Sequence, residues 1–307
     1  MKRWIITVLP VLLIVLALVF SLKTERPQQS VDRVVGDGRV YNRIVSLSPG
    51  ITETLFALGV GDRVVGVTRF CLFPLEAQEK AEVGGFVDPN YEAIVALEPD
   101  LVLVLEIHGD VVRYLDELEI NYATVRNEGV SDILASIITV GRVCGIEPRS
   151  REIVDDIERR MRIIGEKTRD TESPDVLISV SRQAGTGSLG DVYVAGRETF
   201  FNELIEIAGG VNAYHGRTID YPVISAEGLL VLNPDIIIDI IPHLKSQQLD
   251  VDTVRKDWKS IPGLRAAKNG TVHVVDSRYA VIPGPRFILF LEDLTKIIHP
   301  GLFGETL

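Results

Sequence analysis

Two stretches of the chain share one pattern, EAIVALEPDLVLVL at residues 92–105 and EGLLVLNPDIIIDI at residues 227–240. Each begins with a glutamate, continues through a mostly apolar segment, turns at Pro-Asp and ends in a run of large apolar residues. The first segment has the length of a short helix, and the unbroken apolar run is typical of a strand buried on both faces. The offset of 135 residues between the copies indicates that the chain contains the same kind of unit twice.

The composition limits the classes of partner and site. The 307 residues are enough for two domains of ordinary size. The formal net charge of −11 argues against nucleic acid as a partner, because phosphate binding requires a positively charged face. Cys71, Cys144 and five scattered histidines do not have the spacing of a metal site. We therefore expect no metal and no cofactor, and a buried free thiol at Cys144, which lies in an apolar helical stretch.

The first 42 residues have the pattern of an export or anchoring signal followed by a linker. A basic start, Met1-Lys2-Arg3, precedes an apolar run from Trp4 to Phe20. This order is typical of a cleaved signal peptide, and the run of about 17 residues is also the short limit for an uncleaved membrane anchor. Both interpretations of residues 1–22 place the chain after the linker 23–42 outside the cytoplasmic membrane. No cysteine follows the run directly, so a lipid anchor is not supported.

From residue 43 the pattern alternates between strand and helix. The strand candidates are apolar without alternation, which predicts a parallel sheet covered by helices on both faces. Residues 43–147 are therefore expected to form an N-terminal α/β lobe. Its strands are expected at 43–47, 64–67, 101–105 and 122–125, and its helices at 51–58, 91–97, 111–118 and 131–144.

A long charged helix is expected at residues 148–172. From Ser150 to Asp170 it contains no proline, and a narrow apolar stripe from Ile153 to Ile164 follows helical spacing. It is either a stiff connector or an ordinary surface helix. After Pro174 the alternation restarts, so residues 173–300 form the expected C-terminal α/β lobe. Its strands are expected at 176–180, 236–241 and 272–275, and its helices at 199–208, 226–232 and 286–298.

The chain resembles the periplasmic solute-binding proteins of ABC importers for cobalamin, haem and ferric siderophores, and within them the cobalamin-binding members. The resemblance extends over nearly all of residues 43–298. It implies an α/β fold of two similar lobes with mostly parallel sheets, one long rigid helix joining them, and a ligand cleft between the lobes. It is carried by RIVSLSPGITETLFALGVGDRVVGVT, GGFVDPNYEAIVALEPDLVL, VAGRETFFNELIEIAGGVNAY and IPGPRFILFLEDL.

The resemblance assigns a role to the repeated acids. In this family one glutamate on each lobe docks onto arginines of the membrane permease, and Glu92 and Glu227 match those two glutamates. A pair of carboxylates on a rigid body can set register against two basic pockets. The alternative is local, because a glutamate in a first helical turn is favoured by the helix dipole alone.

Ligand contacts are expected in loops that follow strands. By position, the family implies aromatic contacts at Phe70, Phe86 and Tyr221, with Tyr279 as a further candidate. A flat macrocycle such as a corrin ring is well buried against aromatic faces. Forked hydrogen bonds from arginine suit amides, propionates or catecholate oxygens, and the arginine candidates are Arg182 and Arg286.

One departure bears on the ligand. Cobalamin-binding relatives often carry Asp-Tyr-Pro where this chain has Leu72-Phe73-Pro74. Haem and ferric siderophores therefore stay open as alternatives to a corrinoid. The chain shows no G-x-S-x-G, P-loop or His-Glu-x-x-His motif, so we expect a binding protein and not an enzyme that uses the cleft. We expect a monomer whose partners are the small-molecule ligand and ABC permease subunits, associated with the membrane through the permease or the N-terminus.

Overall fold

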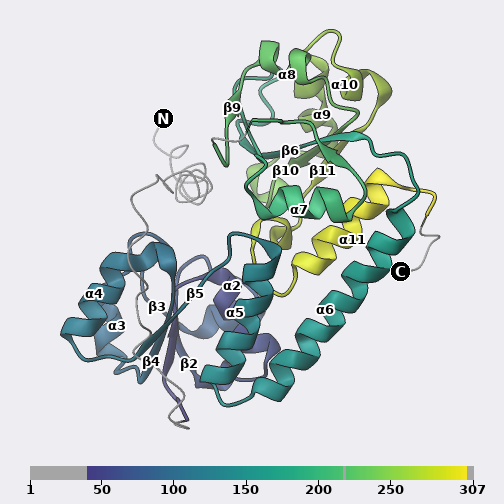
Figure 1. Ribbon diagram of the computed structural model, residues 1–307. Coiled ribbons are helices and arrows are strands. Elements are labelled where there is room, and N and C mark those ends of the chain that lie inside the picture. The colour runs from purple at the N-terminus through teal and green to yellow at the C-terminus, as the bar shows by residue number, and fades with distance from the viewer. Residues whose placement is uncertain (1–39, 217–218, 303–307) are drawn as a thin grey trace, which may run out of the picture. The chain divides into compact units, whose positions relative to one another are not determined.

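The computed structural model describes residues 40–216 and 219–302 (Figure 1). The predicted signal peptide or anchor at residues 1–22 lies outside these ranges, as does nearly all of the predicted linker. The described chain forms two compact units. The N-terminal unit comprises residues up to Arg159 together with Ile282–Phe287, and the C-terminal unit comprises the rest.

The N-terminal unit contains a five-stranded sheet in the order β3-β2-β1-β4-β5. Every pair of neighbouring strands is parallel. The strands are β1 (Ile44–Ser46), β2 (Val64–Val67), β3 (Ala81–Glu82), β4 (Leu101–Leu105) and β5 (Tyr122–Val125). The helices are α2 (Pro49–Ala57), α3 (Tyr91–Ala96), α4 (Gly109–Glu117) and α5 (Val130–Val143), with 3-10 turns η1 (Gly61–Arg63), η2 (Leu75–Glu79) and η3 (Glu106–His108).

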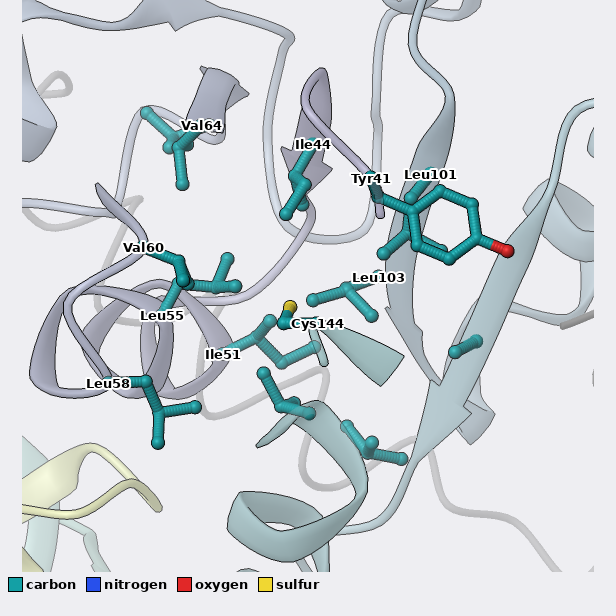
Figure 2. Packing of buried hydrophobic residues seen from close by; sticks show 14 of the residues in the cluster. Tyr41, Ile44, Ile51, Leu55, Leu58, Val60, Val64, Leu101, Leu103 and Cys144 are labelled. Atoms are coloured by element: carbon teal, nitrogen blue, oxygen red, sulfur yellow. The ribbon is translucent and has the colours of Figure 1, made fainter. Parts of the chain in front are cut away.

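The core of this unit lies on both faces of the sheet. Leu101 and Leu103 of β4 pack into one apolar cluster, and Val102 and Val104 pack into another. Figure 2 shows the first cluster, in which the strand residues meet α2 and the thiol of Cys144. Because successive side chains of a strand point to opposite faces, these two clusters explain why β4 is apolar without alternation. The predicted parallel sheet covered on both faces is confirmed.

The C-terminal unit contains a mixed six-stranded sheet in the order β11-β10-β6-β7-β9, with β8 paired to β6. The pairs of β6 with β10 and β8, and of β10 with β11, are parallel, whereas β7 pairs antiparallel with β6 and β9. The strands are β6 (Asp175–Arg182), β7 (Val192–Val194), β8 (Val211–Asn212), β9 (Val223–Ile224), β10 (Ile236–Ile240) and β11 (Val272–Val275). The helices are α7 (Phe200–Ile207), α8 (Ala226–Leu232), α9 (Val251–Lys259), α10 (Arg265–Asn269) and α11 (Phe287–Ile298), with 3-10 turns η4 (Leu244–Gln247) and η5 (Arg278–Val281).

The predicted helix between the lobes is present as α6 (Glu147–Thr168). The division between the two units falls inside it, between Arg159 and Arg160. Val154, Ile157 and Ile164 of its predicted apolar stripe are buried. The helix is thus one continuous element with residues in both units, and the division lies upstream of the predicted boundary at residues 172–173.

A short segment near the C-terminus, Ile282–Phe287, packs with the N-terminal unit. The prediction had placed it inside the C-terminal lobe. A Cβ atom on Gly50 would lie 2.2 Å from the carbonyl oxygen of Pro283, and one on Gly284 would lie 3.0 Å from the Cα of Gly50. The backbones therefore approach so closely that a side chain at Gly50 would clash with Pro283, and one at Gly284 would be crowded. We call Ile282–Phe287 the return segment.

Both cysteines are free and buried. Burial raises the pKa of the Cys144 thiol to about 11, as expected for an inert core thiol. Within residues 40–216 and 219–302, no helix combines the length and the apolar character needed to cross a bilayer.

Candidate functional site

The two repeated glutamates occupy matching helices. Glu92 lies in the first turn of α3, where the side chain of Asn90 accepts a hydrogen bond from the amide of Ala93 at 3.0 Å. Glu227 lies in the first turn of α8, where Ser225 Oγ accepts from the amide of Gly228 at 3.3 Å. A polar side chain thus caps each helix at the same place, which satisfies one of the free amides of the first turn.

The match continues past the end of each helix. Glu98 and Asn233 both adopt left-handed backbone conformations, with φ of 45° and 41°. The Pro-Asp turn follows in both copies. Asp100 accepts hydrogen bonds from the two backbone amides just before β1, and Asp235 accepts one from the first amide of β6, Asp175. Each short helix is therefore held to the central part of its own sheet, and the glutamate is presented on a fixed element.

Both glutamates are exposed. Neither forms an ion pair within the described part of the chain. The pKa of Glu227 is lowered by hydrogen bonds from its own backbone amide and from the Ser225 hydroxyl, which lies 2.9 Å from the carboxylate. An exposed, ionised carboxylate at the surface of a rigid element suits recognition by a basic partner.

The carboxyl edge of the N-terminal sheet carries two of the predicted aromatic residues. Phe70 lies in the turn after β2, and Phe86 lies in the loop after the neighbouring strand β3. Both side chains are half-buried. In open parallel sheets the loops at the carboxyl ends of the strands form the binding edge. The topology thus places Phe70 and Phe86 on that edge.

His108 holds Phe86 in place. The two rings meet edge to face with centroids 5.1 Å apart. The Leu105 amide donates to Nδ1 of His108 at 3.1 Å, so Nε2 carries the proton and donates to the Phe86 carbonyl at 2.8 Å. Burial lowers the pKa of His108 to about 4, so the imidazole is neutral at neutral pH.

Arg286 of the return segment stacks on an exposed aromatic ring. Its guanidinium carbon lies 3.6 Å from the ring centroid of Phe73, a side chain that is 43% exposed. Its Nε and Nη2 donate to the two carboxylate oxygens of Glu53 at 2.9 and 2.5 Å. Glu53 is buried, and its pKa is raised by burial, which the hydrogen bond and charge of Arg286 oppose. The result is a forked ion pair below an aromatic surface that faces solvent.

The sequence analysis did not select Glu53. Its surroundings in α2 mark it out, because this helix buries Thr52, Glu53 and Thr54 in succession. An acid that falls within such a buried run requires a cationic partner. The partner, Arg286, is 233 residues away in the chain, and no local pattern indicates it.

Arg182, which the sequence predicts as a ligand contact, is held by two buried acids of the C-terminal unit. Its side chain is 1% exposed and forms ion pairs with the buried Asp239 and Asp257. All five guanidinium N–H groups have an acceptor: Asp239 twice, Asp257 once, and the carbonyl groups of Gln183 and Val254. No donor is left for a ligand, because a buried guanidinium must satisfy its own hydrogen bonds within the fold.

Tyr221 also packs inside the C-terminal unit. Its ring meets that of Phe201 edge to face at 6.4 Å, and Phe201 in turn packs on Phe290. The residue is only 6% exposed, and burial raises the pKa of its phenol. Packing, which is the ordinary role of an aromatic residue, therefore accounts for the position of Tyr221, and its contact with a ligand stays a prediction.

The carboxyl edge of the C-terminal sheet carries Tyr279 and a polar pair that the sequence analysis missed. Tyr279 is half-buried and donates its hydroxyl to Asp293 at 2.5 Å. Arg278 Nη2 lies 2.8 Å from Nδ1 of His243, and partial burial and the charge of Arg278 lower the pKa of that histidine. His243 and Arg278 follow β10 and β11 in the sequence, so the rule that selected Tyr279 could also have found them.

The predicted ligand contacts thus fall into three groups, the first of which is the buried pair Arg182 and Tyr221. The second group, Phe70, Phe86 and Arg286, lies in the N-terminal unit, where the guanidinium of Arg286 stacks on the ring of Phe73. Tyr279 lies on the carboxyl edge of the C-terminal sheet, where its hydroxyl already has a partner. Among the described residues, no group of three or more His, Cys, Asp or Glu side chains comes together to hold a metal ion.

Comparisons with known proteins agree on one family. Residues 44–279 match the family model described as periplasmic binding protein. The ABC transporter substrate-binding lipoprotein YvrC of Bacillus subtilis is 31% identical, with 86% of this chain and 82% of the relative aligned. A cobalamin-binding protein of Halobacterium salinarum is 28% identical over 84% of this chain and 69% of its own length. The periplasmic heme-binding protein RhuT of Roseiflexus has a TM-score of 0.71 at 27% identity, covering 84% of this chain and 98% of that protein.

Proposed function

The chain belongs to the periplasmic binding protein family, and we propose that it captures a cobalamin-like corrinoid outside the cytoplasmic membrane and delivers it to the permease of an ABC importer. One observation carries the delivery step: an exposed glutamate is repeated on two capped helices, each held to its own sheet. In this proposal the protein makes and breaks no covalent bond, and Glu92 and Glu227 dock onto basic side chains of the permease.

The candidate ligand surface is the carboxyl edge of the N-terminal sheet. The exposed ring of Phe73 offers a flat apolar face for a corrin ring, and Arg286 keeps that ring in place from below. Phe70 and Phe86 extend the aromatic character of this edge. Tyr279 is the remaining candidate from the C-terminal unit. The support for a corrinoid comes from the cobalamin-binding relative and from this aromatic edge.

A haem or a ferric siderophore is the alternative ligand. The heme-binding structure that resembles this chain favours it. A porphyrin is also a flat macrocycle and would stack on Phe73 in the same way. Its propionates, like the catecholate oxygens of a siderophore, would attract an arginine more strongly than the neutral amides of a corrinoid would.

A ligand screen tests the proposal. The purified protein is titrated with cobalamin, cobinamide, hemin and a ferric catecholate siderophore, and absorbance and thermal unfolding are recorded. We expect both corrinoids to raise the melting temperature by mass action, and Phe73→Ala to weaken their binding by about tenfold, because an exposed stacking face is lost. Phe56→Leu, a substitution on a half-buried ring of the core, is the matched control and should leave affinity unchanged. If hemin binds and neither corrinoid does, the ligand is haem and the corrinoid proposal fails.

A further inference from the structure

The two helices that carry the repeated glutamates, α3 and α8, expose apolar side chains on the same face as the glutamate. On α8 these are Leu230, 41% exposed, and Val231, 85% exposed. They follow Glu227 by three and four residues, and residues at this spacing share one face of a helix. On α3 the residue three positions after Glu92 is Val95, 39% exposed. The duplicated element therefore repeats an exposed apolar residue together with its acid.

Each helix has one buried residue on the side opposite its glutamate. Leu229 is 0% exposed and packs into the core of the C-terminal unit. Ile94, the residue in the same position of the first copy, is 1% exposed and packs against β4 and its neighbours. These anchors fix the rotation of each helix. The apolar side chains beside the glutamates therefore stay exposed to solvent, because the helix cannot rotate to bury them.

An acid next to an exposed apolar group suits a particular kind of partner. Apolar groups that exclude water around an ion pair lower the local dielectric and strengthen the attraction. A partner that offers a basic side chain surrounded by apolar groups would match the face formed by Glu227, Leu230 and Val231. The face on α3 is of the same kind and smaller, because Ala96 stands where α8 has Val231.

We infer that Leu230 and Val231, and to a smaller extent Val95, make direct apolar contact with the permease beside the two docking glutamates. This inference rests on the proposed function, since it names the permease as the occupant of these faces. The apolar contact adds a contribution to the binding free energy that does not depend on the salt concentration. The glutamates supply the attraction that salt screens, and the apolar residues supply the part that remains at high ionic strength.

The test measures binding of the full chain to its own organism's permease–ATPase complex in nanodiscs, between about 0.05 and 0.5 M NaCl. The variants are Val231→Ser, Leu230→Ser/Val231→Ser and Glu227→Gln. Val231→Thr keeps the shape of the side chain and controls for packing. Val211→Ser, at a residue that is 42% exposed in the same unit, controls for the loss of an exposed apolar group elsewhere.

We expect Val231→Ser to weaken binding by about tenfold at every salt concentration, and the double variant to weaken it further. Val231→Thr should fall between the wild type and Val231→Ser, and Val211→Ser should bind as the wild type does. Glu227→Gln should weaken binding at low salt and approach the wild type at high salt. Sedimentation velocity on the same proteins reports whether the face pairs two copies of this chain instead.

Wild-type affinity in Val231→Ser and in the double variant would overturn the inference, and so would a self-association that Val231→Ser abolishes. If the glutamate variant still loses affinity in that case, the proposed function stands and only the apolar contact fails. If the wild-type chain does not bind the complex at all, the proposed function fails and the inference fails with it.

Discussion

Arg182 and Arg286 show how the surroundings of a residue decide its role. Both are arginines near the ends of apolar segments, and the sequence gives no reason to separate them. The structure surrounds Arg182 with acceptors for all of its donors, so it belongs to the core of the C-terminal unit. Arg286 holds Glu53 and supports the exposed ring of Phe73. Only the second arrangement leaves a surface that a ligand can reach.

His108 predicts how stability depends on pH. Its pKa is about 4 in the folded chain, below the ordinary value of 6.5. Between these two values the unfolded chain binds a proton that the folded chain does not, so stability falls as pH decreases from 6.5 to 4. The loss from this residue should be roughly 3 kcal/mol. Urea unfolding at a series of pH values should show that His108→Gln loses less free energy of unfolding at acid pH than the wild type does.

The exposed His215 provides the control for this comparison. His215→Gln replaces a histidine whose side chain is exposed and should show the same loss of stability at acid pH as the wild type. Identical pH dependence in His108→Gln and the wild type would mean that His108 titrates normally in the folded chain.

At the scale of elements, the two helices that carry the repeated glutamates, α3 and α8, are short and depend on their caps. α3 has six residues and α8 has seven, too few for a helix to be stable without tertiary contacts and capping. Their positions are determined by the buried residue on one side, the N-cap at the start and the Pro-Asp turn at the end. The position of each glutamate therefore depends on groups that would not touch the permease in the proposed docking.

The cap of α3 can be tested directly. Asn90→Ala removes the acceptor for the Ala93 amide and should destabilise the chain by about 1 kcal/mol, as N-cap losses commonly do. Asn90→Asp keeps an acceptor in the same place and should be close to the wild type. Chemical unfolding of the three proteins measures this difference. Equal stability of Asn90→Ala and Asn90→Asp would show that the cap contributes nothing.

At the scale of the whole molecule, one chain presents the same acidic face twice. Each unit has its own sheet and core, and each carries one of the two repeated glutamates. The chain also passes between the units more than once, through α6 and again through the return segment. In the proposed function, two equivalent contacts with the permease are coupled to the delivery of one ligand.

Charge reversal of both glutamates tests that coupling. Glu92→Lys/Glu227→Lys should abolish uptake of the ligand into cells, because two lysines repel the basic permease surface. It should leave ligand affinity unchanged, because neither residue lies among the candidate ligand contacts. Glu79→Lys/Glu198→Lys makes the same change of charge at two other exposed positions and should transport normally. A loss of ligand affinity in the first variant would contradict the separation of docking from capture.

The sequence by itself determined the buried strands at the centre of each sheet and most of the helices, though not α9 and α10, because these elements depend on contacts between residues close in the chain. The pattern was sufficient for β2, β4, β5 and β11, and for the duplication that selected Glu92 and Glu227. Tertiary structure alone decided the antiparallel strands β7 and β9, the burial of Arg182 and the pairing of Glu53 with Arg286. These depend on short segments that meet far from their place in the chain, where periodicity gives no information on which side chain will find which partner.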